Sequence, residues 1–402
     1  MQRSDVIAVL TAAATQAHAF LAANDVIAAV LCILFALNVI AEASDYDTRM
    51  KRESRVFFHR VDLLFPEDGP VWRVLEARSV QGYLHYFRVT PAAFDDILAH
   101  CDPDWVAWRD GWTNAMRLHR RAGRQHLLTA RMAIALALAF MATTVAQKDY
   151  EMLFGVTHAT LDRDLLQGLQ RLHEALQNGG YGPMWPTHEE QIEAADAMDI
   201  QWGVDVYGTR CFAFVDGLRL RIMEPDGVVE QGLWYNGFTK TINCTNLLVW
   251  TIRGTICYAD INNFGRVHDA ALARQLTPIL RNAAHTLPNY SVLGDDAFGH
   301  HATADIYATK AHVPNGLPAA FIADNRPLFC QQQLCKRNGV EWGMRTLQAL
   351  WPRVKMPLPY QNAKRELILD VAIELTNFVA RNVEHHNQLK TVYQEALLRG
   401  GM

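Results

Sequence analysis

The sequence predicts a mixed α/β protein with a helical N-terminal half and a C-terminal half that combines strands and helices. Residues 80–178 show helical apolar periodicity with helix start signals. From Gly208 onward, short β-type runs bounded by Gly and Asp follow one another before helices return. Strands followed by a strand and helices within one segment are typical of a mixed α/β domain.

Composition limits the class of protein. A length of 402 residues is enough for two or three domains, and an apolar content of 50% excludes a disordered or collagen-like chain. The net charge of -4 excludes a globally basic nucleic-acid binder, but it leaves room for a local basic patch. The 7 cysteines are scattered and form no C-x-x-C pair, which favours a reducing compartment over a disulfide framework or a cysteine zinc site.

The chain divides at composition changes. The breaker-rich stretch 177–186 marks the main boundary, because Gly and Pro interrupt helices. We expect five parts: a helical appendage of unknown role at 1–60, a helical region at 61–180, a linker at 181–208, the α/β domain at 209–385 and a tail at 386–402.

The appendage contains an apolar run at 26–41. The run is about four residues shorter than the ~20 residues that a membrane span needs. We therefore favour a buried or partner-facing helix over a membrane anchor, and we do not expect membrane attachment. A membrane-tethered protein with a cytosolic α/β domain is the alternative interpretation.

Helices in the first half have local signals. Thr90 and Pro91 start one helix as N-cap and first residue, and 127–145 is an apolar, Ala-rich core helix. Residues 149–176 form two helices around Gly155, a spacing typical of a helix-turn-helix element.

In that interpretation Thr157 caps the second helix, and four of its residues face a DNA groove: Thr157, His158, Thr160 and Arg163. Asp162 and Asp164 would bring negative charge to the same surface. A helix pair that serves only packing is the alternative.

In the second half, strands are predicted at 210–215, 218–223, 246–252, 255–259 and 290–293, with a hairpin turn at Arg253-Gly254. Helices are predicted at 267–282, 340–351 and 367–382.

Three acids stand at element ends in this prediction: Asp216 and Asp295 after strands, and Glu341 at the start of a helix. Converging carboxylates cannot all stay ionised at close range without a cation, and Mg²⁺ prefers such oxygen ligands. Two ions would clamp the attacking and leaving oxygens of a phosphodiester. Ordinary turn acids are the alternative. Asp296 is also acidic, but strand alternation would point it to the opposite face.

The blocks around these acids resemble the PIF/Harbinger transposase-like nucleases, a DDE-type family with an RNase H-like catalytic domain. The resemblance covers about residues 80–380 and keeps the family's order. It is carried by Phe214–Gly217, Tyr235–Gly237 with Thr241–Asn246, Gly265–Asp269, Leu293–Phe298 and Glu341–Trp351.

The resemblance implies a metal-dependent DNA endonuclease with a two-metal mechanism, followed by strand transfer if that step survives. Asp216, Asp295 and Glu341 would be the catalytic triad that binds Mg²⁺ or Mn²⁺, and Asp269 is either a fourth metal contact or a helix N-terminal acid. Family members often act with a separate Myb-like DNA-binding protein, and self-association is a further expectation.

The chain also departs from the family pattern, at Trp234, Arg266, Val267, Gly343, Arg345, Gln348 and Leu350. Two of these changes remove basic groups expected near DNA, which Lys336 and Arg337 would partly replace. This motivates an alternative function: a domesticated, catalytically weakened DNA- or protein-binding protein that keeps the fold.

A basic run provides a second candidate for DNA binding, through Arg117, Arg120, Arg121 and Arg124. Arginines without nearby acids suit phosphate contacts, although a solvated charged loop has the same appearance. The run is also a weak nuclear-import signal, so we expect the nucleus, with some protein in the cytoplasm.

Overall fold

The computed structural model describes residues 12, 14–16, 63–119, 128–204, 206–208, 210–299, 306–308, 318–383 and 388–400, apart from the side chains of 112–119, 147, 296, 299, 308, 399 and 400. Nearly all of the predicted appendage, including its apolar run, lies outside these residues. Within the described part of the chain, no helix is long and apolar enough to cross a membrane.

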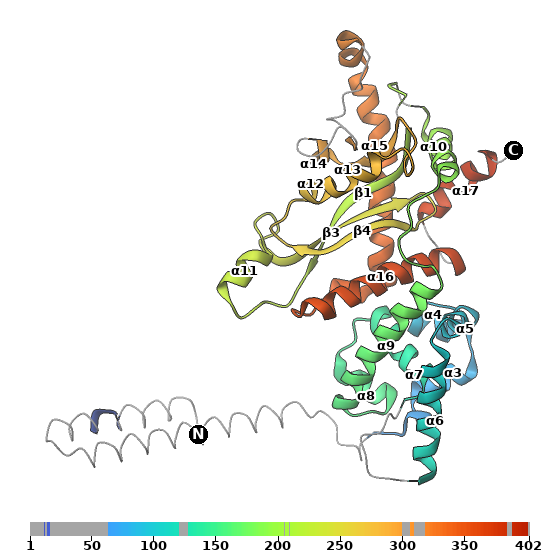
Figure 1. Ribbon diagram of the computed structural model, residues 1–402, viewed down its shortest axis with the longest axis vertical. Helices are drawn as coiled ribbons and strands as arrows, with labels where there is room; N and C mark the ends of the chain where they lie inside the picture. The colour runs from blue at the N-terminus through green and yellow to red at the C-terminus, as the bar shows by residue number, and fades with distance from the viewer. Residues whose placement is uncertain are drawn as a thin grey trace.

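The first half is a group of helices, which Figure 1 shows to one side of the sheet. They are η2 (Pro66–Asp68), α3 (Pro70–Ala77), α4 (Val80–Phe87), α5 (Pro91–Ala99), α6 (Pro103–His119), α7 (Ala130–Ala142), α8 (Gln147–Phe154) and α9 (His158–Asn178). Helix α7 is the centre of this group, since every residue from Met132 to Ala142 is buried. As predicted, Thr90 caps α5: its hydroxyl accepts from the Ala93 amide at 3.2 Å.

The second half is built on a six-stranded mixed sheet. Its strands are β1 (Arg210–Arg221), β2 (Tyr235–Asn236), β3 (Thr241–Thr251), β4 (Ile256–Phe264), β5 (Tyr290–Gly294) and β6 (Tyr307–Ala308). The order is β2-β3-β1-β5-β6, with β4 paired to β3. Strand β1 runs antiparallel to β3 and parallel to β5. The predicted β3–β4 hairpin is confirmed.

Helices flank this sheet, as the mixed α/β prediction requires (Figure 1). They are α10 (His188–Trp202), α11 (Val228–Trp234), α12 (Asp269–Leu272), η3 (Ala273–Leu276), α13 (Thr277–Arg281), α14 (Asp296–Gly299), α15 (Ala319–Leu350), η4 (Pro352–Lys355), α16 (Asn362–Asn382) and α17 (Gln388–Gly400).

Several predicted elements differ from the structure. The two runs around Asp216 form one continuous strand, because Asp216 and Gly217 pair with β3 instead of turning. The helix expected at 267–282 is split into α12, η3 and α13, with Pro278, which lacks an amide donor, at the start of α13. Helix α15 begins at Ala319, so Glu341 lies within it and does not open it.

Helices lie at both ends of the α/β domain, including the short helical linker predicted at 189–198. The segment predicted as a linker contains α10, which packs against β1 and α17. The segment predicted as a tail contains α17, whose Tyr393 hydroxyl accepts from the Trp202 indole at 3.1 Å. Both segments therefore belong to the packed layer beside the sheet.

Helices α9 and α16 join the two halves of the molecule. The buried Glu374 of α16 accepts a hydrogen bond from Gln177 and contacts the His173 ring at 2.9 Å. On the same helix, Asn377 accepts from the Ile256 amide at 2.6 Å and donates to the Ile256 carbonyl at 2.9 Å. These contacts fix α16 against both the helical group and β4.

Two glycines let α15 approach the sheet closely. A Cβ added at Gly343 would lie 2.6 Å from Trp250 Cδ2, and one added at Gly339 would lie 2.8 Å from Phe214 Cε2. Trp250 and Phe214 are buried on β3 and β1. The spacing between α15 and the sheet is therefore set by contacts that leave no room for a side chain at these positions.

We expect Gly343→Ala to lower the free energy of unfolding by about 1–3 kcal/mol, because the new methyl group must displace the Trp250 ring. Urea denaturation followed by Trp fluorescence measures this. Gly111→Ala in α6 is the matched control: a Cβ there meets no described atom within 4 Å, so the change should be neutral or stabilising. Equal losses in both variants would contradict the close approach.

Candidate active site

The predicted aspartates come together at the middle of the sheet. Strands β1 and β5 are parallel, and Phe214 pairs with Leu293. Asp216 and Asp295 each lie two residues further along, so the register places them side by side. The charge of Asp295 raises the pKa of Asp216, as expected for neighbouring carboxylates.

Asp269 joins them from the first residue of α12. A Cβ added at Gly217 would lie 2.3 Å from the Asp269 Cγ, so glycine is required for this carboxyl group to lie against β1. Arg219 Nη2 donates to Asp269 Oδ2 at 2.8 Å. The other carboxyl oxygen, Oδ1, is buried and has no hydrogen-bond partner in the described structure.

Burial and mutual repulsion both act on these groups. Desolvation raises the pKa of Asp216 to about 6, with further increases from Asp295 and Asp269. The Gly217 amide, which donates to Asp216 Oδ1 at 2.8 Å, and the Arg337 guanidinium oppose this increase. Burial also raises the pKa of Asp269, against the attraction of Arg219. The cluster is therefore short of positive charge.

Glu341 is held at the edge of this cluster by an arginine. Arg337 lies one helical turn before it on α15, with Nη1 3.3 Å from Glu341 Oε1 and Nη2 3.9 Å from Asp216 Oδ2. The Glu341 side chain is 53% exposed. Among the described residues, no three His, Cys, Asp or Glu side chains form a group that could hold a metal ion. Arg337 thus lies between Asp216 and Glu341.

The donor set has the chemistry that a hard divalent cation prefers. Asp216, Asp269 and Asp295 offer carboxylate oxygens, which Mg²⁺ and Mn²⁺ prefer over nitrogen or sulfur. The unpaired, buried Oδ1 of Asp269 is an acceptor without a donor, a costly condition that a cation would relieve. Glu341 could become a further ligand of the cation only if its carboxylate gave up its contact with Arg337.

Of the predicted DNA contacts on α15, Lys336 needs a correction. Its side chain is fully buried, and Nζ lies 2.8 Å from Asp199 Oδ1 of α10. The lysine therefore joins two helices and does not present charge to DNA. Arg337 is partly exposed, but it serves the acid cluster.

The predicted helix pair is present as α8 and α9, with Gly155 between them. Its polar residues mostly contact each other or nearby acids. His158 lies 3.1 Å from Glu151 and 3.4 Å from Asp162, and the Thr157 hydroxyl contacts that of Thr160 at 3.3 Å. Thr157 is the N-cap of α9 by position, without a side-chain capping bond. Groove recognition by this pair stays a prediction.

The sequence interpretation placed the negative charge of Asp164 on the surface, and the structure contradicts this. It is fully buried, and its Oδ2 lies 3.1 Å from Nη2 of the buried Arg109, while Arg163 contacts its other oxygen at 3.3 Å. Asp164 therefore fixes α9 against α6. Of the basic run, Arg120, Arg121 and Arg124 lie outside the described residues, and Arg117 falls in α6 without a described side chain.

Two site residues escaped the sequence interpretation: Arg219 as the partner of Asp269, and Gly217 as the position that admits its carboxyl group. The available signal for Arg219 was the Arg-Leu-Arg alternation at 219–221. Residues two apart on a strand share a face, so this alternation places Arg219 on the same face of the strand as Gly217.

Comparison with known proteins agrees with this geometry. Residues 215–377 match the model of a family described as DDE superfamily endonuclease. The matched segment contains all four acids and supports a transposase-derived DDE family for this part of the chain. The mixed sheet flanked by helices is consistent with an RNase H-like DDE domain. No curated protein and no solved structure matches the chain.

We expect Asp216 to make the free energy of unfolding depend on pH. Its folded-state pKa of about 6 exceeds the ordinary value of 3.8, so the folded protein binds the extra proton between these values. Without divalent cations, stability should therefore fall as pH rises through this window. Asp216→Asn removes the buried charge and should gain roughly 1–3 kcal/mol at pH 7.5, with a smaller gain toward pH 4.

Urea denaturation in EDTA at several pH values measures this difference. The exposed Asp324→Asn on α15 is the control, with an expected change within about 0.5 kcal/mol. A gain for Asp216→Asn that does not vary with pH would show that burial of its charge is not the cause.

Proposed function

We propose that this protein is a divalent-metal-dependent DNA endonuclease of transposase type, of the PIF/Harbinger kind. The observation that carries the proposal is the electrostatic influence of Asp295 on the pKa of Asp216 and of Asp269, within the segment that matches the endonuclease family. The substrate class is DNA, whose phosphodiester bonds are hydrolysed. Joining of the freed 3′-hydroxyl to a target strand is the second activity that we propose for this site.

We propose Asp216, Asp295 and Glu341 as the metal-binding triad, with Asp269 as a further ligand. In a two-metal arrangement, Mg²⁺ or Mn²⁺ supplies a water of lowered pKa and neutralises charge on the phosphate. The chain's own residues supply position: Arg219 fixes the Asp269 carboxyl group. The Gly217 amide fixes that of Asp216. Phosphoryl transfer needs mostly positioning and charge neutralisation, so this small set suffices.

Arg337 has two roles in this proposal. With no cation bound, it neutralises Asp216 and Glu341. With these carboxylates holding a cation, the Arg337 guanidinium would be free at the edge of the site, where it could bind a phosphate in bidentate fashion. Arg337 is therefore a positioning residue that links occupancy of the acid cluster to DNA contact.

We further propose that the α8–α9 pair and the basic run 117–124 contact DNA outside the cleaved bond. A separate Myb-like protein, self-association and a nuclear location, with some protein in the cytoplasm, complete the proposal. They rest on the family resemblance and the basic run.

The second candidate function is a catalytically weakened protein that binds DNA or protein through the same fold. The observation that favours it is the separation of Glu341 from Asp216 by Arg337. Calorimetry with Mg²⁺ and Mn²⁺ separates the two candidates, because only the nuclease requires cation binding at the acid cluster.

We expect Asp216→Asn and Asp295→Asn each to lower Mg²⁺-dependent nicking of supercoiled DNA about 100-fold or more, since each removes a negatively charged metal ligand. DNA affinity measured in EDTA should change little. Asp324→Asn controls for loss of an acid elsewhere on the surface. Nicking by Asp216→Asn at the wild-type rate would refute the assignment.

We expect Arg337→Gln to bind Mn²⁺ about 5–10-fold more tightly than wild type, because the competing positive charge is gone. Isothermal titration calorimetry at pH 7.5 measures the affinity without DNA. Arg345→Gln, two turns further along α15 and exposed, is the matched control and should leave the affinity nearly unchanged. Unchanged or weaker binding by Arg337→Gln would show that Arg337 does not compete with the cation.

A further inference from the structure

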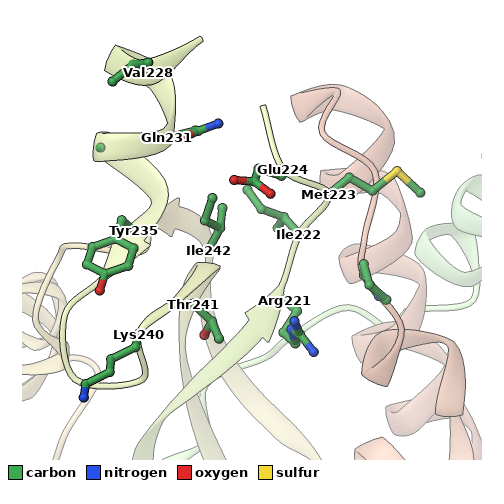
Figure 2. Close-up of a pocket in the computed structure, with 12 residues that line it drawn as sticks. Arg221, Ile222, Met223, Glu224, Val228, Gln231, Tyr235, Lys240, Thr241 and Ile242 are labelled. Carbon is green, nitrogen blue, oxygen red and sulfur yellow. The ribbon is translucent and has the colours of Figure 1, made fainter. Parts of the chain in front are cut away.

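A cavity lies beyond the acid cluster, where β1 ends. It has a volume of about 760 Å³, within the usual range for small-ligand sites. Its walls come from the end of β1 and the residues after it, from α11, and from the turn that joins β2 to β3. Figure 2 shows Ile222 and Ile242 side by side at its centre.

The cavity combines an apolar interior with a cationic end. Ile222 is buried, whereas the ring of Tyr235 is 46% exposed beside the opening. Arg221 and Lys240 lie at one end, and Glu224 lies at the other (Figure 2). In the described structure neither of the two cations has an ion-pair partner, so they keep their charge available for an anion.

The turn 236–240 is fixed in an unusual conformation. Asn236 Oδ1 accepts from the amides of Phe238 and Thr239 at 3.0 and 3.1 Å, and its Nδ2 donates to the Gly265 carbonyl at 2.7 Å. Lys240 has φ of 54°, a left-handed conformation that costs a non-glycine residue about 1–2 kcal/mol. The hydrogen bonds of Asn236 fix the turn and so hold Lys240 in this conformation.

The same turn presents an aromatic ring toward the acid cluster. Phe238 is 87% exposed, a large apolar side chain left in water. The Arg219 guanidinium lies 5.7 Å from the centre of its ring and, at its other side, binds Asp269. One arginine therefore connects the acid cluster to the turn that borders the cavity.

We propose that this cavity binds an unpaired nucleotide of the DNA strand that enters the acid cluster, a proposal that rests on the proposed function. Tyr235 and the two isoleucines would receive the base, because aromatic faces stack on any base. Arg221 and Lys240 would bind its phosphates. Phe238 would stack on the next base toward the cleaved bond. Two cations without ion-pair partners in the described structure, beside the Tyr235 ring, favour a nucleic-acid strand over a peptide.

Fluorescence anisotropy in EDTA tests the proposal without cleavage. The probes are two labelled duplexes of the same sequence, one blunt and one with three unpaired nucleotides at its end. We expect wild type to bind the frayed duplex about 10-fold more tightly, and Tyr235→Ala to reduce this preference to less than about 2-fold. 2-Aminopurine at the unpaired position should be quenched by wild type and not by Tyr235→Ala.

Two further variants make the test independent of folding defects. Lys240→Gly suits the left-handed backbone, so it should keep the fold while lowering the salt dependence of frayed-DNA binding by about one unit of slope. Val229→Ala is the control, since Val229 is exposed on α11 but does not line the cavity. It should keep the full preference and the quenching.

The outcomes separate this proposal from the proposed function. Equal binding of both duplexes by wild type, with Tyr235→Ala unchanged, overturns the nucleotide site and leaves the nuclease assignment standing. No binding of either duplex, in EDTA or with Ca²⁺, overturns the proposed function. A preference that survives in both Tyr235→Ala and Lys240→Gly places the unpaired strand elsewhere and also overturns the nucleotide site.

Discussion

Repulsion among half-buried carboxylates is the constraint on which the rest of the site depends. Asp216, Asp269 and Asp295 come from three separate elements, yet the charge of Asp295 acts on both other carboxyl groups, whose pKa values are raised by burial and by this charge. Partly burying like charges at close range costs free energy, which a proton or a counter-charge recovers. The chain supplies part of it through Arg219 and Arg337. One carboxyl oxygen of Asp269 has no hydrogen-bond donor among the described residues, so these residues do not supply all the positive charge that the acid cluster needs.

The fold keeps these charges together by removing side chains where elements must meet. Gly217 admits the Asp269 carboxyl group, and Gly343 admits the ring of Trp250. A methyl group at Gly343 has no space beside Trp250, so glycine at this position has a packing cause. Gly343 is therefore a condition for bringing α15 close to β3, as Gly339 is for β1.

The strand pattern predicted β5, the β3–β4 hairpin and the position of Asp295, because short apolar runs between turn residues are local signals. It failed at Asp216, since Asp-Gly resembles a turn and only pairing with β3 carries the strand through it. The prediction that Lys336 contacts DNA failed for a related reason. Its neighbours along the chain do not reveal that Asp199, on a distant helix, faces it. Similarly, nothing near Arg337 in the sequence indicates a contact with Asp216.

Assembly of the proposed metal site requires side chains to move, while the helix that carries them stays in place. The packing of Gly339 and Gly343 against β1 and β3 leaves α15 little freedom to move toward Asp216. Glu341 and Arg337 lie one turn apart on that helix, and the exposed Glu341 side chain can change rotamer at little cost. In the proposed site, Glu341 would turn inward toward a cation only if Arg337 left the space between Glu341 and Asp216. An approaching phosphate stabilises the expelled guanidinium, so cation and DNA favour the same arrangement and each should promote binding of the other.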